Sequence, residues 1–322
     1  MAVTMKKFTT ENTETDVKER VRISDPETPS DPASGSSVLS VVKTFGRMVK
    51  FSHTVFALPF ALAATALAAR GHGITLAQIV AILVAMAGAR TAAMGFNRIV
   101  DRRIDAKNPR TAGREIPTGK VSVLSAAFLT ALSAAAFVAA AASLGRLCLA
   151  LSPMVLGLVL GYSFTKRFTW LCHLFLGLAI GIAPAGAWIA VRGDLGAPAI
   201  WLVAAVTTWI GGFDILYALS DREFDRGAGI HSIPARFGVP AALLISALLH
   251  LGTVVALIAA GHSAGLGTIY FAGVAAVVAI FAYEHSIVRP SDLSRVDVAF
   301  FNLNGYVSLV YLLATLAQVV AG

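Results

Sequence analysis

Charged side chains are scarce in this 322-residue sequence, where Asp, Glu, Lys and Arg together make up 14% of the residues. Soluble domains carry about 25%. A mean hydropathy of +0.74 and 57% apolar residues therefore exclude both a soluble globular domain and a chain that is disordered throughout. Cysteine is scarcer still: Cys148 and Cys172 lie inside apolar runs and match no disulfide framework or metal-ligand spacing, so we interpret them as packing residues.

The first 38 residues lack the apolar core that a secretory signal peptide needs. They are rich in Thr, Ser, Glu and Pro, and they hold five basic and seven acidic residues. A segment of this composition buries too little apolar surface to fold by itself. We therefore predict a disordered cytoplasmic tail without catalytic residues at 1–38, followed by a transmembrane domain at 39–322.

Long apolar segments are what the rest of the chain has in abundance. A helix needs about 20 residues to cross the hydrocarbon core of a bilayer, and Gly, Pro or charged residues separate nine stretches of this kind. These features predict an all-α, polytopic membrane protein with nine transmembrane helices around a central cavity. The predicted spans cover residues 48–69, 75–97, 121–142, 147–164, 168–191, 198–219, 239–260, 265–286 and 299–320.

Lys and Arg are distributed unevenly between the two sides of this topology. Of the 21 basic residues after residue 38, 17 fall in connections on one side and three on the other, and Arg90 lies within a span. Because cytoplasmic loops attract positive charge, this bias places the N-terminus in the cytoplasm and the C-terminus outside. We expect a multi-pass protein of the inner (cytoplasmic) membrane that contacts the lipid bilayer and no nucleic acid.

Acidic residues are few after residue 38, and six of the 11 fall in two short segments at cytoplasmic helix ends. In the first segment, Asn97, Asp101 and Asp105 follow one another at intervals of four residues. On a helix that advances about 100° per residue, these side chains lie within an arc of about 80°. The first segment therefore places three oxygen-bearing side chains on one helix face.

The second segment has carboxylates at Asp214, Asp221 and Asp225. On a continuing helix these offsets also return to nearly one direction, which predicts a second acidic stripe. The simplest alternative for both stripes is a solvated surface whose acids are neutralised by neighbouring basic residues. Acids at the edge of apolar spans are costly, however, and are typical of functional sites.

Carboxylates on one helix face repel one another unless a cation lies among them. Oxygen ligands without His or Cys favour Mg²⁺, which shares its coordination shell with substrate phosphates. The neighbouring Arg and Lys side chains suit phosphate oxygens. Together with a membrane cavity, these features predict a lipid-soluble diphosphate substrate and an active site on the cytoplasmic side.

The two segments resemble the signature of the UbiA superfamily of intramembrane prenyltransferases. Residues 97–105 match its NxxxDxxxD motif, and residues 214–225 match its DxxYxxxDxxxD motif. Residues 162–169 are similar to its YPxxKRxT segment, and residues 108–117 to its NPRTxxRPxP-like segment. The resemblance extends over residues 40–322 and is strongest to the 4-hydroxybenzoate polyprenyltransferase branch.

This resemblance implies Mg²⁺-dependent transfer of a polyprenyl group from polyprenyl diphosphate to an aromatic acceptor. The expected acceptor is 4-hydroxybenzoate, in ubiquinone or menaquinone biosynthesis. One Mg²⁺ would lie at the first motif and a second at the second motif. The implied metal ligands are Asn97, Asp101, Asp105, Asp214, Asp221 and Asp225, of which Asp101, Asp105, Asp221 and Asp225 carry the catalysis.

The resemblance also suggests substrate contacts. Lys166 occupies a family position and, with Arg102 and Arg103, is a candidate for binding diphosphate; each could instead be an ordinary interfacial anchor. Tyr162 and Tyr217 would shield the allylic cation or hydrogen-bond to substrate, unless they only pack at helix ends.

An aromatic acid needs a cation for its carboxylate. Lys50 or His53 is the candidate by position, although this stretch departs from the commoner RLDKP pattern of the family. Arg90, seven residues before Asn97 on the same helical face, is the alternative anchor, unless it pairs with a buried acid such as Asp214.

Two further functions remain open from the sequence. A dihydroxynaphthoate or another UbiA-type acceptor could replace 4-hydroxybenzoate within the superfamily. Outside it, an ion-coupled transporter would also carry acids in a membrane. Transporters place these acids near the bilayer midplane, whereas here they lie at cytoplasmic helix ends, which favours the enzyme.

Overall fold

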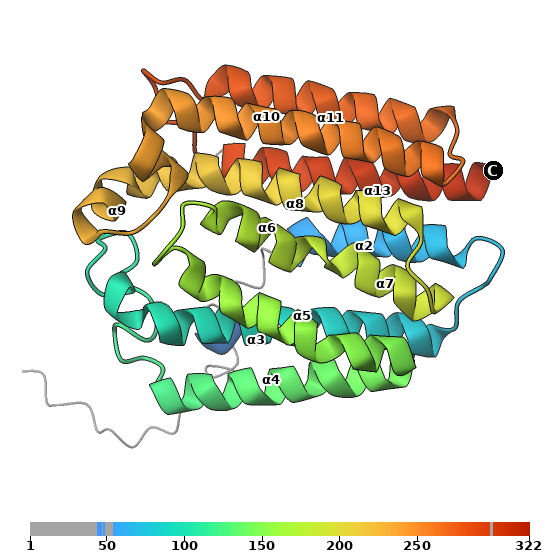
Figure 1. Ribbon diagram of the computed structural model, residues 1–322, viewed down its shortest axis with the longest axis horizontal. Coiled ribbons are helices and arrows are strands. Elements are labelled where there is room, and N and C mark those ends of the chain that lie inside the picture. Colours follow the sequence, from blue (N-terminus) through green and yellow to red (C-terminus); the bar gives the residue numbers. More distant parts are fainter. Residues whose placement is uncertain (1–43, 47, 49–53, 297–298) are drawn as a thin grey trace, which may run out of the picture. The chain divides into compact units, whose positions relative to one another are not determined.

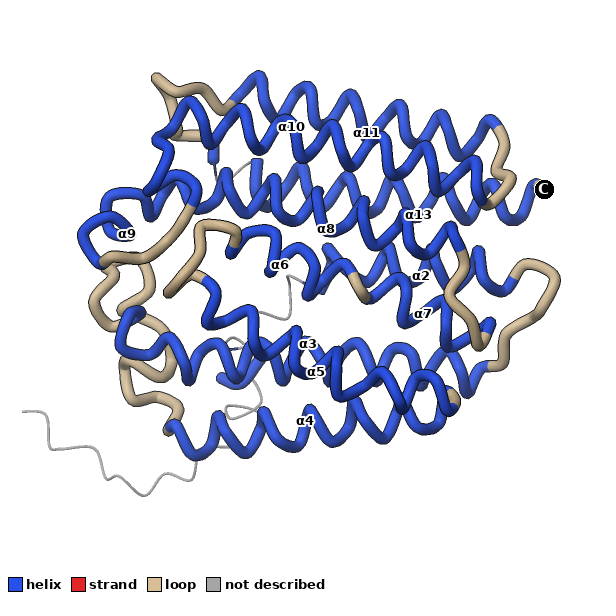
Figure 2. Tube along the Cα trace, in the orientation of Figure 1, coloured by secondary structure: helices blue, strands red, loops and turns tan. Residues whose placement is uncertain are grey.

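The computed structural model describes residues 44–46, 48, 54–296 and 299–322, and this part of the chain is built from helices joined by loops (Figures 1 and 2). It contains no β-strand beyond a single bridge between Arg289 and Asp292. The all-α prediction is therefore confirmed. The main helices are α2 (Thr54–Ala69), α3 (Leu76–Asp105), α4 (Val123–Leu144), α5 (Arg146–Thr165), α6 (Cys172–Gly181), α7 (Ala183–Arg192), α8 (Ala197–Ala218), α9 (Arg222–Ala228), α10 (Ile233–Ser263), α11 (Thr268–Ile287) and α13 (Asn304–Ala321).

Eight segments of the described chain are long and apolar enough to cross a membrane. The segment Cys172–Arg192 counts as one of them, although it is broken into α6 and α7 just before Pro184. Helix α2 has 16 residues and is the ninth apolar segment. In the first predicted span, residues 48–69, residues 49–53 lie outside the described part, and otherwise each of the nine predicted spans has a helical counterpart.

Helix α3 continues beyond the predicted membrane span and carries the first acidic motif. Thr75 caps its first turn in a reciprocal capping box with Gln78, which satisfies backbone groups that the helix leaves open. The helix then runs to Asp105, whereas the predicted span ends at residue 97. Asp101 and Asp105 thus lie on the helix that continues the membrane span, as their spacing predicts.

The second acidic motif does not follow one continuous helix, contrary to the expectation of a regular stripe. Helix α8 ends at Ala218, a 3₁₀ turn covers Leu219–Asp221, and the short α9 begins at Arg222. Ser220 and Asp221 are weak helix formers, and the Asp221 side chain is held by another loop. Tertiary contacts therefore override the helical periodicity at this point.

Helix α8 is the most buried helix and lies between α6 and α10. Gly177 on α6 allows close approach, because a Cβ there would collide with the Thr207 backbone of α8. Trp209 of α8 is fully buried and donates a 2.6 Å hydrogen bond to Asn304 of α13. Beside it, Phe60 of α2 stacks on Tyr311 with ring centroids 4.4 Å apart.

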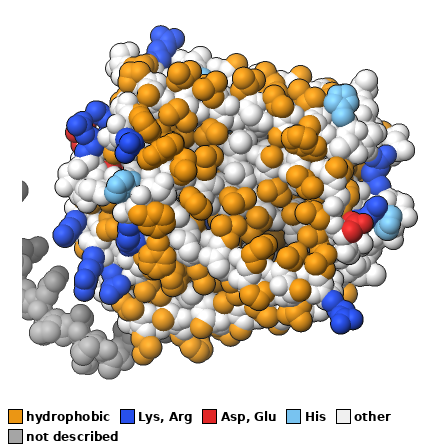
Figure 3. Space-filling model, in the orientation of Figure 1, with side chains coloured by type: hydrophobic (Ala, Val, Ile, Leu, Met, Phe, Trp, Pro, Cys, Tyr) orange, Lys and Arg blue, Asp and Glu red, His pale blue; other side chains and the backbone are white. Residues whose placement is uncertain are grey.

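Large hydrophobic side chains cover the flank of the helical domain, and Lys and Arg gather at the end where α9 lies (Figure 3). Leu124, Phe128 and Leu132 show the pattern on α4: they are 80%, 69% and 56% exposed at intervals of four residues. Such a stripe would be unfavourable in water but suits contact with lipid. The fold is that of a multi-pass membrane protein.

Candidate functional site

The side chains of the first acidic motif and their partners form one cluster, called the first cluster below. The carboxylate of Asp101 lies at its centre. Asp101 is almost fully buried on α3, and its carboxylate forms ion pairs with Lys166 at 2.6 Å and with Arg167 at 3.1 Å. Both basic residues follow the C-terminal end of α5, where the chain turns back. Asn97, one turn earlier on α3, donates to Asp101 at 2.9 Å and also contacts Ser163 at 3.4 Å. Three oxygen-bearing side chains from α3 and α5 thus converge beside two cations.

Asp105 lies one turn beyond Asp101 and is also buried. Its Oδ1 receives a 2.7 Å ion pair from Arg114, which belongs to the loop that follows α3. Its Oδ2 is buried and has no hydrogen-bond partner among the described residues. A buried carboxylate oxygen without a partner is costly, so this atom is available to a cation.

The loop after α3 also reaches the second motif. Asn108 donates a 3.0 Å hydrogen bond to Asp221, and the guanidinium of Arg110 binds both oxygens of the same carboxylate. Arg110 additionally donates to the hydroxyl of Tyr217, over whose ring its guanidinium lies at 4.7 Å. Burial opposes the charge of Arg110, but these hydrogen bonds raise the pKa of its guanidinium above its ordinary value. Arg110 therefore stays cationic and joins the two motifs.

Asp225 is the buried acid of α9. It accepts a 2.8 Å hydrogen bond from the hydroxyl of Ser232, which is the N-cap residue of α10 and also accepts from the amide of Ala235. This fixes the turn between α9 and α10 against the second motif.

Asp214 has a different partner from Asp221 and Asp225. It lies on α8 itself and forms a 2.7 Å contact with Nδ1 of His173, a buried residue of α6. A rise of 1.5 Å per α-helical residue and about 2 Å per 3₁₀ residue places it roughly 12 Å from Asp221 along the chain axis. Asp214 therefore lies on α8 with His173 as its partner, whereas Asp221 and Asp225 follow the end of that helix.

Two predicted diphosphate contacts, Arg102 and Arg103, form no ion pair with an acid among the described residues. Arg102 donates to the backbone oxygen of Ile99 at 2.8 Å, and Arg103 is exposed. Successive residues on a helix point about 100° apart, so the positions beside Asp101 cannot share its direction. Lys50, the predicted acceptor contact, lies outside the described residues, as does His53.

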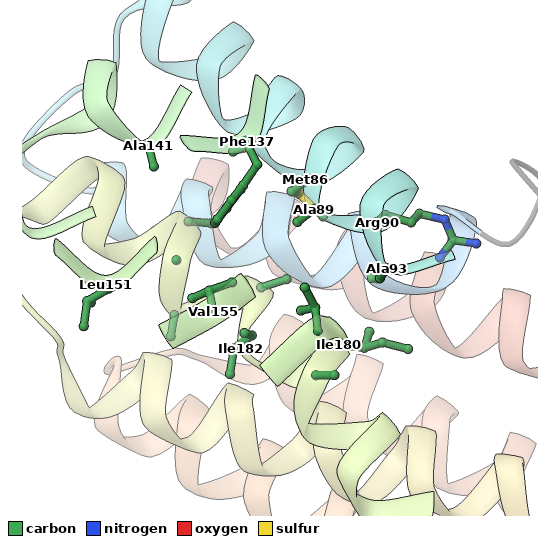
Figure 4. A pocket seen from close by; sticks show the side chains of 18 of the residues that line it. Met86, Ala89, Arg90, Ala93, Phe137, Ala141, Leu151, Val155, Ile180 and Ile182 are labelled. Atoms are coloured by element: carbon green, nitrogen blue, oxygen red, sulfur yellow. The ribbon is translucent and has the colours of Figure 1, made fainter. Parts of the chain in front are cut away.

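An apolar cavity of about 510 Å³ lies between α2, α3, α4, α5, α6, α7 and α8 (Figure 4). Arg90 of α3 is the charged residue of its lining, and Tyr162 of α5 provides a hydroxyl. In Figure 4 the Arg90 side chain lies at one end of the labelled residues and Leu151 near the other. Met94, three residues before Asn97 on the same helix, also lines the cavity, so the cavity begins about 5 Å along α3 from the first cluster.

The donor atoms of the two clusters fit Mg²⁺. They are oxygens of carboxylates and an amide, which are the ligands that hard divalent cations prefer. The partnerless Oδ2 of Asp105 is such an atom. In the part of the chain that the structure describes, no three His, Cys, Asp or Glu side chains converge into a ready-made metal centre. The acids are instead paired with Lys166, Arg167, Arg114 and Arg110.

Sequence reasoning did not assign several residues that the structure brings to these clusters. Arg110 and Arg114 lie in the segment similar to NPRTxxRPxP, and Arg167 directly follows Lys166, so the motifs already contained them. His173 carried a simpler signal, because a lone ionisable residue inside an apolar span is unusual.

Comparison with known proteins agrees with this geometry. Residues 57–306 match the UbiA prenyltransferase family. A 4-hydroxybenzoate octaprenyltransferase of Alcanivorax borkumensis is 36% identical over 229 residues, which cover 71% of this chain and 78% of that protein. The protein of the same name from Vibrio cholerae is 34% identical over 221 residues, which cover 68% of this chain and 77% of that protein.

Solved structures show the same fold. A UbiA homologue from Aeropyrum pernix superimposes with a TM-score of 0.75 at 36% identity and covers 82% of this chain and 97% of its own. A UbiA homologue from Archaeoglobus fulgidus, solved with DMAPP and Mg²⁺, superimposes with a TM-score of 0.67 at 20% identity. The match covers 87% of this chain and 100% of that chain. With two motifs, an apolar cavity and these relatives in agreement, the chain belongs to the UbiA prenyltransferase family.

Proposed function

We propose that this protein transfers a polyprenyl group from a polyprenyl diphosphate to an aromatic acceptor, with 4-hydroxybenzoate as the preferred acceptor. The observation that carries the proposal is the position of the acidic clusters. Two motifs more than 100 residues apart are tied together by the loop after α3, and an apolar cavity begins about 5 Å along α3 from the first of them. A charged binding site next to an apolar cavity suits a substrate with a diphosphate head and an isoprenoid tail.

Mg²⁺ is the metal that the donor set favours. Asn97, Asp101 and Asp105 would hold one ion, and Asp221 and Asp225 a second. Bound there, Mg²⁺ would neutralise the charge that develops on the diphosphate as it leaves. The family name and the Mg²⁺-containing structure of a distant homologue support this assignment.

The basic residues of the clusters are placed to bind the diphosphate. Lys166, Arg167, Arg110 and Arg114 already contact the acids and present ammonium and guanidinium groups that pair well with phosphate oxygens. By holding the leaving group, they favour cleavage of the bond between its oxygen and the allylic carbon, with the electron pair departing on the diphosphate.

The acceptor then completes the reaction. The ring carbon ortho to the phenolic hydroxyl forms a bond to the allylic carbon, and loss of the ring proton restores aromaticity. Water would trap the allylic cation, so the apolar lining of the cavity protects it. Tyr162 and Tyr217 lie on the cavity lining and beside Asp221, respectively, where a ring face or a hydroxyl can contact substrate.

Arg90 is the described residue best placed for the acceptor carboxylate, because it is the charged member of the cavity lining. A carboxylate-bearing acceptor fits this arrangement, and the curated relatives are named for 4-hydroxybenzoate. Dihydroxynaphthoate also carries a carboxylate beside a hydroxyl-bearing ring, so it is the second candidate.

The basic end of the domain defines the proposed orientation. Lys and Arg gather where α9 and the acidic clusters lie (Figure 3), which supports a cytoplasmic active site, a cytoplasmic N-terminus and an external C-terminus. We place the protein in the inner membrane, with residues 1–38 as a tail that takes no part in catalysis.

Product identification tests this function. Membranes that contain the protein are incubated with Mg²⁺, a polyprenyl diphosphate and either 4-hydroxybenzoate or dihydroxynaphthoate, and the extracted lipids are analysed by mass spectrometry. We expect a prenylated aromatic acid in which the prenyl group has replaced one ring hydrogen. Membranes without the protein serve as the control, and the absence of product with both acceptors contradicts the proposal.

A further inference from the structure

His173 is a buried polar residue in the apolar helix α6, outside both sequence motifs. Its imidazole makes two hydrogen bonds at once. Nδ1 lies 2.7 Å from Oδ2 of Asp214 on α8, and Nε2 accepts a 3.2 Å hydrogen bond from the backbone amide of Ile233 at the start of α10. One side chain thus connects three helices beside the second acidic motif.

The hydrogen bond from Ile233 assigns the roles of the two ring nitrogens. An amide N–H can only donate, so Nε2 must offer its lone pair, and the proton of the neutral ring then lies on Nδ1. That proton points to the Asp214 carboxylate. His173 therefore acts as a donor toward Asp214, and it holds one of the two carboxylate oxygens in place.

Asp214 occupies a position where orientation matters for the reaction. Along α8 it lies between the cavity-lining Val203 and the Asp221 end of the motif. A substrate with its diphosphate at the acidic clusters and its tail in the cavity must place its scissile bond between these two points. The Asp214 side chain is 23% exposed, and Oδ1 has no hydrogen bond within the described part of the chain. One oxygen is fixed, and the other is available to substrate.

We propose that His173 is a positioning residue, which holds the Asp214 carboxylate in one orientation and ties it to the start of α10. The inference rests on the proposed prenyl transfer and extends it to a residue outside the motifs. The start of α10 is also where Ser232 binds Asp225 at 2.8 Å. His173 therefore links the orientation of Asp214 to the turn that fixes Asp225.

The chemistry of the two hydrogen bonds defines the decisive variants. Leucine at position 173 is of similar bulk but can neither donate nor accept. Glutamine carries an amide N–H and a carbonyl oxygen, so it can do both. A positioning role predicts that H173L fails and H173Q retains function, whereas a role in packing alone predicts that both variants behave alike.

Steady-state kinetics in lipid nanodiscs separate positioning from substrate binding. His173 touches none of the basic residues proposed for the diphosphate, so H173L should lower kcat by roughly 10- to 100-fold and leave KM for the polyprenyl diphosphate unchanged. H173Q should restore most of kcat. The double variant H173L/D214N should be no slower than D214N alone, because both changes remove one interaction. The control H262L removes an exposed histidine from the last turn of α10, at the opposite end of that helix from Ile233, and should keep the wild-type kcat.

A spectroscopic measurement tests the contact without relying on activity. In protein labelled with ¹⁵N-histidine, the His173 signal is identified by its loss in H173Q and should report protonation at Nδ1. D214N should shift this signal, and D105N should leave it in place. Absence of product from the wild-type protein would refute the proposed function, and the spectrum would still decide whether His173 holds Asp214. Wild-type kcat in H173L, no rescue by H173Q, or a signal insensitive to D214N overturns the inference.

Discussion

The side-chain amide of Asn108 donates a 3.0 Å hydrogen bond to the carboxylate of Asp221, although the two residues are 113 positions apart. Asn108 belongs to the loop that follows the first acidic motif, and Asp221 belongs to the second motif. Arg110 of the same loop binds both oxygens of Asp221. The loop that follows the first acidic motif therefore binds the second motif directly and fixes the two motifs relative to each other.

This link predicts the effect of removing Arg110. Hydrogen bonds to charged groups contribute about 1.5–3 kcal/mol, or roughly 10- to 150-fold in an equilibrium constant. R110A should therefore lower kcat/KM for the polyprenyl diphosphate by about that factor. Lysine cannot bind both oxygens of a carboxylate in a fork, so R110K should recover only part of the loss.

The matched control for Arg110 is R295A, which removes an exposed arginine from another connection on the same side. Its kcat/KM should equal that of the wild type. Equal losses in R110A and R295A would mean that general positive charge, rather than the contact with Asp221, explains the effect.

Arg90 should determine how the enzyme treats the acceptor carboxylate. R90L removes the charged group from the cavity lining, so KM for 4-hydroxybenzoate should rise by at least about tenfold, as expected for a charge-assisted hydrogen bond. KM for the polyprenyl diphosphate should stay the same. A phenol without the carboxylate separates the alternatives, because its turnover should be equal in wild type and R90L. An equal loss with both acceptors would contradict the assignment.

The buried polar contacts of α13 should contribute to the stability of the fold and not to catalysis. Asn304 is fully buried, accepts from the Trp209 indole at 2.6 Å and donates to Glu284 at 3.0 Å. N304A removes a hydrogen-bond partner from the buried Trp209 indole and from the buried Glu284 carboxylate, which lowers the free energy of unfolding by about 1–3 kcal/mol. Thermal unfolding in detergent should show a lower Tm. T315A removes a buried hydroxyl that bonds only within its own helix and should lower Tm less.

The N-terminal tail should be dispensable. Deletion of residues 1–38 removes the segment whose composition predicts disorder, and kcat of the shortened protein should match that of the full chain. Loss of catalysis in a truncated protein that inserts and folds correctly would show that the tail contributes to the site.

Local periodicity was enough to predict the first cluster from the sequence. Side chains four residues apart share a helix face wherever the helix lies, so Asn97, Asp101 and Asp105 could be grouped without a structure. The structure confirms the helix and places Lys166 beside Asp101. Long apolar runs likewise define the membrane helices, because burial in lipid depends on composition more than on specific contacts.

Contacts that depend on tertiary structure could not be predicted in the same way. Arg114 reaches Asp105 because the loop after α3 folds back, and α8 ends before Asp221 because that residue is held from another loop. Neither fact follows from spacing. Arg102 is a further case, because its hydrogen bond to the backbone oxygen of Ile99 does not follow from the spacing of the acids.

The central claim is that both acidic motifs serve one Mg²⁺-dependent transfer, and single-turnover prenylation by purified protein tests it most directly. The rate of product formation is measured for wild type, D101A and D221A, each with Mg²⁺ and after chelation by EDTA, with circular dichroism to verify folding. We expect product from the wild type with Mg²⁺ alone, none after chelation, and none from either folded variant. Near-normal turnover in D101A or D221A, or turnover without Mg²⁺, would contradict the account.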